Sequence, residues 1–240
     1  MTPRRSFVAV HDDGDIRTIT LQHAPTANAL SSGMVAELSE VLRESAERSV
    51  MAVVVRAAGA AFSGGFDLRD VDAETDATLA ERFVAVQTLL DEVAAAPFVS
   101  LALVDGAAVG AGADLAVACD FRVGTDAARF RFPGSRFGVA LGLTRLRSCI
   151  GSERQLEAMS GRWIGAAEAE NWGILTHRTS TLQEAVAKVG ELAAGIAQIE
   201  RGALRIALES IRAMAQPGMT TLLPSITPGL HARVSAYARR

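Results

Sequence analysis

Two glycine-rich segments carry the residues of this sequence that can do chemistry, residues 62–68 (FSGGFDL) and 106–115 (GAAVGAGADL). Glycine and small side chains let the main chain approach a bound molecule closely. The second segment leads into an expected helix, whose first N–H groups have no acceptors within the helix. Two such N–H groups directed at one oxygen stabilise an oxyanion, so the segments indicate chemistry at a carbonyl group.

Asp114 is the one acid within the second of these segments. It follows Ala111 by three residues and has apolar neighbours, where burying an unpaired carboxylate is costly. Such burial raises the pKa of a carboxyl group toward neutrality, where it can transfer protons. We interpret Asp114 as a general acid or base, with a polar role at the helix start as the alternative. For Asp67, after the first glycine segment, we favour a structural role, because an Asp in this position commonly caps the next helix.

The elements that must position these segments alternate between strands and helices. Apolar and β-branched stretches predict strands over residues 7–10, 16–21, 51–55, 98–104 and from 121 to 123. Helical spacing of apolar residues predicts helices over 32–42, 79–94, 152–160, 166–172, 182–199 and 203–215. Residues 57–68 and 106–110 are predicted as loops. This order is typical of α/β layers with largely parallel strands, which bind ligands at the loops that follow the strands.

Composition limits the classes of function. The 240 residues are 49% apolar and have a formal net charge of −3, which fits one α/β domain with a modest appendage. That charge gives no field suited to nucleic acid or an anionic membrane. No run approaches the roughly 20 apolar residues of a membrane span, and the first residues lack a signal peptide's apolar core. The four histidines show no spacing typical of metal ligands, so we expect no metal. We expect a cytoplasmic protein that binds neither nucleic acid nor membrane.

The glycine segments and their surroundings resemble the central pattern of the enoyl-CoA hydratase/isomerase (crotonase) family. The matching pieces are residues 62–68, 104–122 (VDGAAVGAGADLAVACDFR), 28–30 (NAL), 132–133, 137–138 and 161–173, within a resemblance that covers about residues 6–215. The resemblance implies an α/β fold, a crotonase-like spiral of ββα units with a C-terminal helical region. It also implies an acyl-CoA thioester as substrate, and no separate cofactor, because CoA is part of the substrate.

The same resemblance assigns roles to individual residues. The two oxyanion amides fall on Phe66 and Ala111, and the first family carboxylate falls on Asp114, which makes these three the expected catalytic set. Residues 64–68 would hold the adenine and pantetheine end of CoA, helped by the main chain near residues 24–27. The residues that it assigns to substrate binding are Ala24, Ala27, Gly64, Gly65, Phe66, Asp67, Leu68, Gly110, Ala111 and Gly134.

Gly134 departs from the family pattern, because the second family carboxylate would fall there. A hydratase of this family uses two carboxylates to position water and move its proton, and here one is shortened to Asp114 and the other is absent. An ion, a water, Ser135, Arg136 or the substrate's own carboxylate are open as replacements. We expect an acyl-CoA enzyme of the hydratase (lyase) type. Isomerisation, decarboxylation and C–C bond cleavage through the same enolate, and a non-catalytic acyl-CoA-binding scaffold, stay open.

Residues 1–190 are expected to form the crotonase-like core and residues 191–240 a shortened C-terminal helical trimerisation region, in a homotrimer or hexamer as the resemblance implies.

A nicotinamide-dependent reductase is the rival function, because the glycines of residues 106–112 resemble a dinucleotide loop. That loop lies in mid-chain after another α/β unit. The only tyrosine, Tyr237, and the only lysine, Lys188, cannot form the Tyr-x-x-x-Lys pair of such reductases.

Overall fold

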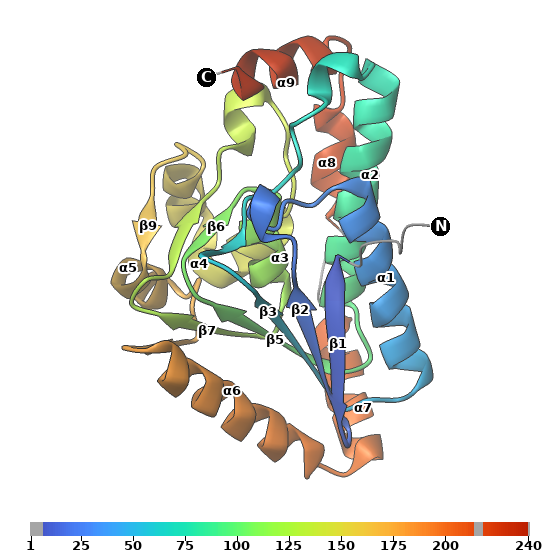
Figure 1. The fold of residues 1–240 in the computed structure, drawn as a ribbon, viewed down its shortest axis with the longest axis vertical. Helices are drawn as coiled ribbons and strands as arrows, with labels where there is room; N and C mark the ends of the chain where they lie inside the picture. Colours follow the sequence, from blue (N-terminus) through green and yellow to red (C-terminus); the bar gives the residue numbers. More distant parts are fainter. Residues whose placement is uncertain (1–6, 214–217, 240) are drawn as a thin grey trace.

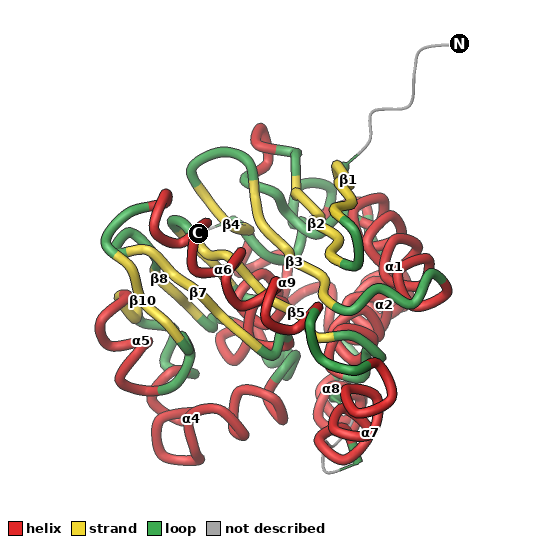
Figure 2. Tube along the Cα trace, turned by 90° about the horizontal axis from the view of Figure 1, so that it is seen from below, coloured by secondary structure: helices red, strands yellow, loops and turns green. Residues whose placement is uncertain are grey.

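A computed structural model, which describes residues 7–213 and 218–239, contains two β-sheets flanked by helices (Figure 1). The six-stranded sheet has the order β1-β2-β3-β5-β7-β10, and Figure 2 shows these strands side by side. Its strands are β1 (Val8–Asp13), β2 (Ile16–Leu21), β3 (Ala52–Ala57), β5 (Val99–Val104), β7 (Phe121–Thr125) and β10 (His177–Thr179). Only β1 and β2 pair antiparallel; the other neighbours pair parallel. The prediction of a largely parallel α/β fold is therefore confirmed.

The second sheet was not predicted from the sequence. It has the order β4-β6-β8-β9 and consists of β4 (Ala61–Ser63), β6 (Ala107–Val109), β8 (Arg129–Arg131) and β9 (Ile164–Gly165). Strands β4, β6 and β8 are parallel, whereas β9 runs antiparallel to β8. The loop predictions over residues 57–68 and 106–110 were thus wrong where β4 and β6 lie. Elements of two or three residues are too short to show the alternation by which a strand is recognised.

The helices agree with the sequence prediction more closely at their centres than at their ends. Helices α1 (Ser32–Glu47), α2 (Asp76–Ala94), α5 (Ala166–Trp172), α6 (Leu182–Ala197) and α7 (Arg201–Arg212) correspond to predicted helices. The prediction over residues 152–160 falls on the second half of α4 (Leu143–Ala158), which breaks at Gly151. The last two residues of the prediction over 203–215 lie outside the described residues. The remaining elements are α3 (Ala111–Ala118), α8 (Met219–Ser225), α9 (Leu230–Ala238) and the 3₁₀ turns η1 (Ala24–Thr26), η2 (Val71–Ala73) and η3 (Gly134–Phe137).

The six-stranded sheet separates two apolar layers. Val53 and Val55 of β3 belong to the larger core, which includes residues of α1, α2 and α3. Their neighbours Ala52 and Val54 face a second cluster, which includes residues of α6 and α7. Helix α6 accordingly lies on one side of the sheet and α1 and α2 on the other (Figure 1). Both sides of the central strands are covered, which explains why they read as continuous apolar runs.

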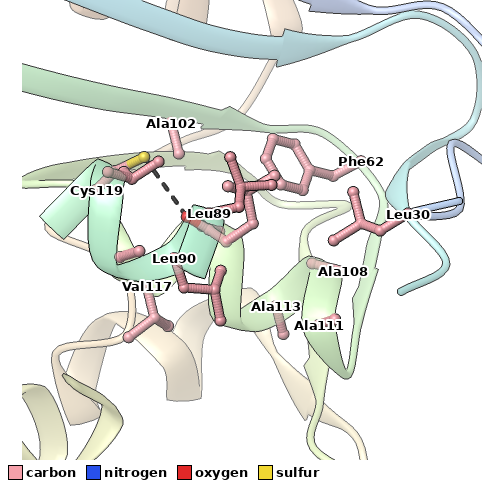
Figure 3. Close-up of a cluster of buried hydrophobic side chains, with 14 of the residues drawn as sticks. Leu30, Phe62, Leu89, Leu90, Ala102, Ala108, Ala111, Ala113, Val117 and Cys119 are labelled. Carbon is pink, nitrogen blue, oxygen red and sulfur yellow. Dashed lines mark hydrogen bonds between the residues drawn. The ribbon is translucent and has the colours of Figure 1, made fainter. Parts of the chain in front are cut away.

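Helix α3 lies inside the larger core, and every one of its residues is buried. Figure 3 shows side chains of α3 such as Ala113 and Val117 among buried neighbours that include Phe62 and Leu89. A helix that is apolar on all sides and enclosed on all sides is held firmly in place. The one acid of this helix, Asp114, is therefore carried into an apolar interior.

The C-terminal helices pack back onto the preceding chain. Helix α6 runs without interruption across residue 190 and contacts β3, β5 and β7. Helix α8 contacts α2, and α9 contacts α2, η2 and η3. The division at residue 190 and the trimerisation role of residues 191–240 stay predictions. Among the helices of residues 7–213 and 218–239, none combines the length and the apolar character that crossing a membrane requires.

Candidate functional site

The second sheet brings the two glycine segments together. Strands β4, β6 and β8 are parallel, so the segments that follow them meet at one edge of the sheet. A cavity of about 110 Å³ opens there, and α9 contributes Tyr237 to its wall. The predicted site residues in its lining are Gly64, Phe66, Leu68, Gly110, Ala111, Asp114 and Gly134. The other predicted residues, Ala24, Ala27, Gly65 and Asp67, are not part of that lining.

The two segments that hold Phe66 and Ala111 are interlocked at Gly65. Its φ is +88°, and a Cβ atom there would lie 2.3 Å from the Val109 carbonyl oxygen and 3.3 Å from the Ala111 nitrogen. Only glycine fits such a position. Within the described residues, no acceptor takes the N–H of Phe66 or of Ala111. Two unpaired main-chain donors on adjoining segments of one cavity are what an oxyanion requires.

Asp114 lies in the first turn of α3 and is 6% exposed. Its main-chain N–H donates to the Gly110 carbonyl oxygen, at 2.9 Å. Its carboxyl group has no hydrogen-bond or ion-pair partner among residues 7–213 and 218–239, and burial raises its pKa well above the ordinary value. The carboxyl group therefore stays protonated at pH values where an exposed aspartate is ionised. A buried acid of this kind can donate a proton to a substrate in the cavity.

A second, wider cavity lies against Asp114, with a volume of about 580 Å³. Gln87, Asp91, Gly142 and Arg145 are among its lining residues. A Cβ atom at Gly142 would lie 2.4 Å from Asp114 Oδ1, so this glycine is pressed against the carboxyl group. Sequence reasoning missed both Gln87 and Gly142, because neither belongs to a motif and α2 and α4 meet at Asp114 only in the fold.

Phe66 and Asp67 make defined contacts beside the cavity. The Phe66 ring stacks on Phe83 with 4.0 Å between ring centroids, and the Arg82 guanidinium lies 4.4 Å from its centroid. The Asp67 carboxylate accepts hydrogen bonds from Arg69, the shortest at 2.6 Å, and these hold its pKa below the usual value. The interpretation of Asp67 as a helix cap was wrong, because its partners are the main-chain N–H and the guanidinium group of Arg69 in the same loop. No group of three or more potential metal ligands occurs in the described part of the chain.

Asn28 fastens the turn at residues 24–28 to the start of the first glycine segment. Its side-chain amide donates to the carbonyl oxygens of Ala58 and Ala61, both at 3.0 Å, and accepts from the His23 N–H at 2.7 Å. The carbonyl oxygen of Ala27 accepts from the Gly64 N–H at 2.7 Å. Ala27 thus contacts the site at Gly64, and Ala24 lies in the same turn, where its carbonyl oxygen accepts from the Ala27 N–H at 2.9 Å. The motif at residues 28–30 marked this region in the sequence, but not which side chain does the fastening.

We expect Asn28→Ala to lower the free energy of unfolding by about 3 kcal/mol. The side chain is 1% exposed, and its removal leaves two carbonyl oxygens and one N–H without their partner. Urea denaturation followed by circular dichroism measures the change. Asn171→Ala is the matched control, because Asn171 is exposed on α5 and should change stability by less than about 0.5 kcal/mol. Equal stability of the two variants would contradict the role of Asn28.

Gly134 begins η3 and has no room for a side chain. A Cβ atom there would lie 2.7 Å from the Val139 carbonyl oxygen, and the Val139 N–H donates to the Gly134 carbonyl oxygen at 3.0 Å. The Ser135 hydroxyl donates to the Met159 carbonyl oxygen, and Arg136 donates to that of Ser160. The two side chains suggested as replacements for the missing acid, Ser135 and Arg136, are therefore engaged with residues 159–160. Asp114 is the one acid among the residues that line the smaller cavity.

Gly134→Glu is expected to destabilise the protein by about 1–3 kcal/mol without raising any hydration rate. The new Cβ atom would overlap the Val139 carbonyl, so the turn must shift and the added carboxylate is misplaced. Thermal unfolding and initial rates with an enoyl-CoA measure both effects. Gly134→Ala shares the overlap but adds no carboxylate, so it should lose similar stability. A stable Gly134→Glu protein with faster hydration would refute this view of the turn.

The sequence and the fold resemble those of known proteins. The family model described as enoyl-CoA hydratase/isomerase matches residues 12–224. The chain is 35% identical over 182 residues to the probable enoyl-CoA hydratase echA6 of Mycobacterium tuberculosis, covering 74% of this chain and 72% of that protein. It is 31% identical to 4-chlorobenzoyl coenzyme A dehalogenase-2 of an Arthrobacter species, covering 78% and 70%. A crystal structure from Bordetella parapertussis, assigned to the enoyl-CoA hydratase/isomerase type, superposes with a TM-score of 0.92 at 29% identity, covering 98% of this chain and 100% of that chain.

Proposed function

Because this chain belongs to the enoyl-CoA hydratase/isomerase family, we propose that it is an enzyme that adds water to a 2-enoyl-CoA thioester. The thioester carbonyl oxygen accepts hydrogen bonds from the N–H groups of Phe66 and Ala111, which stabilise the enolate that forms during the reaction. One observation carries the proposal: two unpaired main-chain donors and a buried Asp114, whose pKa burial raises, line the same cavity. Oxyanion stabilisation and proton transfer can therefore act on one bound acyl group.

The CoA part of the substrate binds along residues 64–68 and the main chain of Ala24 and Ala27. The hydrogen bond from Gly64 to Ala27 supports this, because it joins the two segments into one surface beside the cavity. Gly65, Asp67 and Leu68 shape the same loop. No separate cofactor is part of the proposal, since CoA belongs to the substrate. A homotrimer or hexamer is the proposed assembly, and sedimentation equilibrium of the purified protein tests it.

Asp114 alone carries the proton chemistry of the proposed hydration. Its protonated oxygen gives a proton to the α-carbon, while its other oxygen takes a proton from the water that attacks the β-carbon. The double bond becomes a single bond, one C–O and one C–H bond form, and the carboxyl group ends protonated, as it began. The raised pKa of Asp114 and the lack of space for an acid at Gly134 both support a mechanism with one carboxyl group.

A second candidate is isomerisation of a 3-enoyl-CoA to the conjugated 2-enoyl-CoA, and the presence of a single acid in the smaller cavity favours it. Ionised Asp114 would take a proton from the α-carbon and return it to the γ-carbon of the same enolate. Isomerisation needs no activated water, so a single acid suffices. Decarboxylation through the same oxyanion hole stays open as a third reaction, and binding without turnover is a further outcome of the experiment below.

Incubation with CoA thioesters separates these functions. Hydration of crotonyl-CoA removes the absorbance of the conjugated double bond, whereas isomerisation of a 3-enoyl-CoA creates it. Short, long and aromatic enoyl-CoAs should be tried at the same protein concentration. If none of them loses conjugated absorbance above background, the hydratase proposal fails. Isothermal titration that shows binding without any turnover would identify a non-catalytic acyl-CoA-binding scaffold.

A further inference from the structure

Asp114 forms part of the wall between the smaller cavity and the wider one. The wider cavity has about five times the volume, 580 Å³ against 110 Å³. Even so, the side chain is only 6% exposed. Gln87 and Gly142 line the wider cavity together with it.

Gly142, which contacts the Asp114 carboxyl group, is hydrogen-bonded to Gln87. Gly142 has a φ of +60°, and its Cα lies so close to the carboxyl group that no side chain fits between them. Its N–H donates to Gln87 Oε1 at 3.1 Å. Gln87 is 1% exposed, and its Nε2 donates to Asp91 Oδ1 at 3.1 Å. Both ends of the glutamine amide are therefore used, and its orientation is fixed.

Helix α8 holds the same segment from its other end. The Ala140 N–H donates to Ser225 Oγ at 3.2 Å, and Thr221 Oγ1 donates to the Ala140 carbonyl oxygen at 3.3 Å. The Gly218 N–H, at the start of α8, donates to the Asp91 carboxylate at 2.9 Å. Residues 138–142 are thus held between α2 and α8. A segment held at both ends keeps its contact with Asp114 without relying on the substrate.

We propose that Gln87 is a positioning residue for Asp114, which holds Gly142 against the carboxyl group and so keeps the water of the wider cavity away from it. The assignment deepens the proposed function, because it rests on Asp114 as the acid of the reaction. It concerns the state of Asp114 in the free protein, however, and this state exists whether or not a thioester is turned over.

The charged and titratable groups around Asp114 determine which way its pKa moves when this barrier is removed. Asp91 faces it from α2, Arg145 and Arg147 from α4, and Tyr237 from α9. Strands β4, β5 and β6, packed against α3, have no charged residue. Burial is the cause of the raised pKa, so hydration of the carboxylate lowers it. The two arginines act in the same direction once water connects the groups, and Asp91 acts in the opposite one.

Carbon NMR of protein labelled with ¹³C at the aspartate carboxyl carbons tests the proposal. The Asp114 signal is identified by its loss in Asp114→Asn, and its pH midpoint is then followed in Gln87→Met, a neutral side chain of similar size. We expect the midpoint to fall by at least about one pH unit, because a partly hydrated carboxylate approaches its ordinary pKa of roughly 3.9. An unchanged midpoint in folded Gln87→Met would overturn the proposal.

Gln155→Met is the matched control. Gln155 donates from Nε2 to the Leu143 carbonyl oxygen at 2.7 Å, so this variant also loses a glutamine bond next to Gly142 but leaves Gln87 in place. The pH midpoint of Asp114 in this variant should match that of the unaltered protein. An equal fall of the midpoint in Gln87→Met and Gln155→Met would contradict the proposal, because it would show that Gln87 contributes only general packing. If Gln87→Met does not fold, Ser225→Ala releases Ala140 instead and should shift the midpoint in the same direction. A protein without turnover but with this shift would refute the proposed function and leave the role of Gln87 intact.

Discussion

Asp114→Asn is expected to lower the turnover of a CoA thioester by about 10²- to 10⁴-fold while thioester binding persists. Asparagine has nearly the size and shape of the protonated aspartate but cannot exchange the proton that the α-carbon requires. The Phe66 and Ala111 amides are untouched, so the carbonyl oxygen is still bound. Initial rates and isothermal titration measure the two effects separately. Asp13→Asn is the control, since Asp13 is exposed at the end of β1. Turnover within tenfold of the unaltered protein would exclude Asp114 as the acid.

The same substitution has an effect on stability whose sign follows from the raised pKa of Asp114. In the unfolded chain this carboxyl group ionises near pH 3.9, whereas in the folded protein it keeps its proton to higher pH. The folded state therefore binds more protons over this window, and its stability falls as pH rises from about 3.9 to the folded pKa. Asparagine does not titrate, so the variant avoids this loss. At pH 7 we expect Asp114→Asn to unfold at the same temperature as the unaltered protein or at a higher one.

Gly65→Ala is expected to lower turnover by about 10²- to 10³-fold, the usual effect of losing one oxyanion donor. A main-chain donor cannot be deleted by changing its own side chain, but it can be displaced through its neighbour. The alanine Cβ atom would lie 2.3 Å from the Val109 carbonyl oxygen, so the segments that hold Phe66 and Ala111 must move apart. Both donors then lose their common target. Initial rates with the best substrate from the thioester survey measure the loss.

Gly14→Ala separates this displacement from the strain of a positive φ. Gly14 has a φ of +58°, lies in the turn between β1 and β2, and has no atom within 4 Å of the Cβ position. Its alanine variant has the backbone strain without the collision, and we expect its turnover to be unchanged. If Gly65→Ala and Gly14→Ala both retain full activity, the interlocked segments are not the oxyanion hole. The melting temperature of each protein shows how much of any loss comes from unfolding.

The sequence predicted the elements whose residues repeat a pattern over several turns or strand positions. Strand β3 could be recognised from a continuous run of apolar, β-branched residues, which are buried on both faces of the sheet. Helix α1 could be recognised because apolar residues recur at helical spacing after Ser31, which caps the helix. The second sheet was not, since β4, β6, β8 and β9 each have only two or three residues. Their pairing depends on long-range contacts, which no local window of sequence contains.

The site was predictable to the extent that it follows from main-chain geometry. Glycine segments after strands, and an acid three residues into a helix, place Phe66, Ala111 and Asp114 at one cavity, and that meeting is confirmed. Their catalytic roles stay predictions. The sequence also showed that Gly134 lacks an acid, but not that the Val139 carbonyl oxygen leaves no space for one. Gln87 could not be recognised from the sequence, because its hydrogen-bond partner Gly142 lies 55 residues away in the chain.

The contribution of α9 to the site has a consequence for the order in which the protein is built. Tyr237 lines the smaller cavity, and Arg233 donates to the Phe137 carbonyl oxygen at 3.1 Å. Both sheets precede these residues in the chain, so a ribosome completes them before α9 emerges. A growing chain can therefore bring the amides of Phe66 and Ala111 together while the cavity still lacks one wall. We expect tight thioester binding to arise only after α9 has been made and has docked.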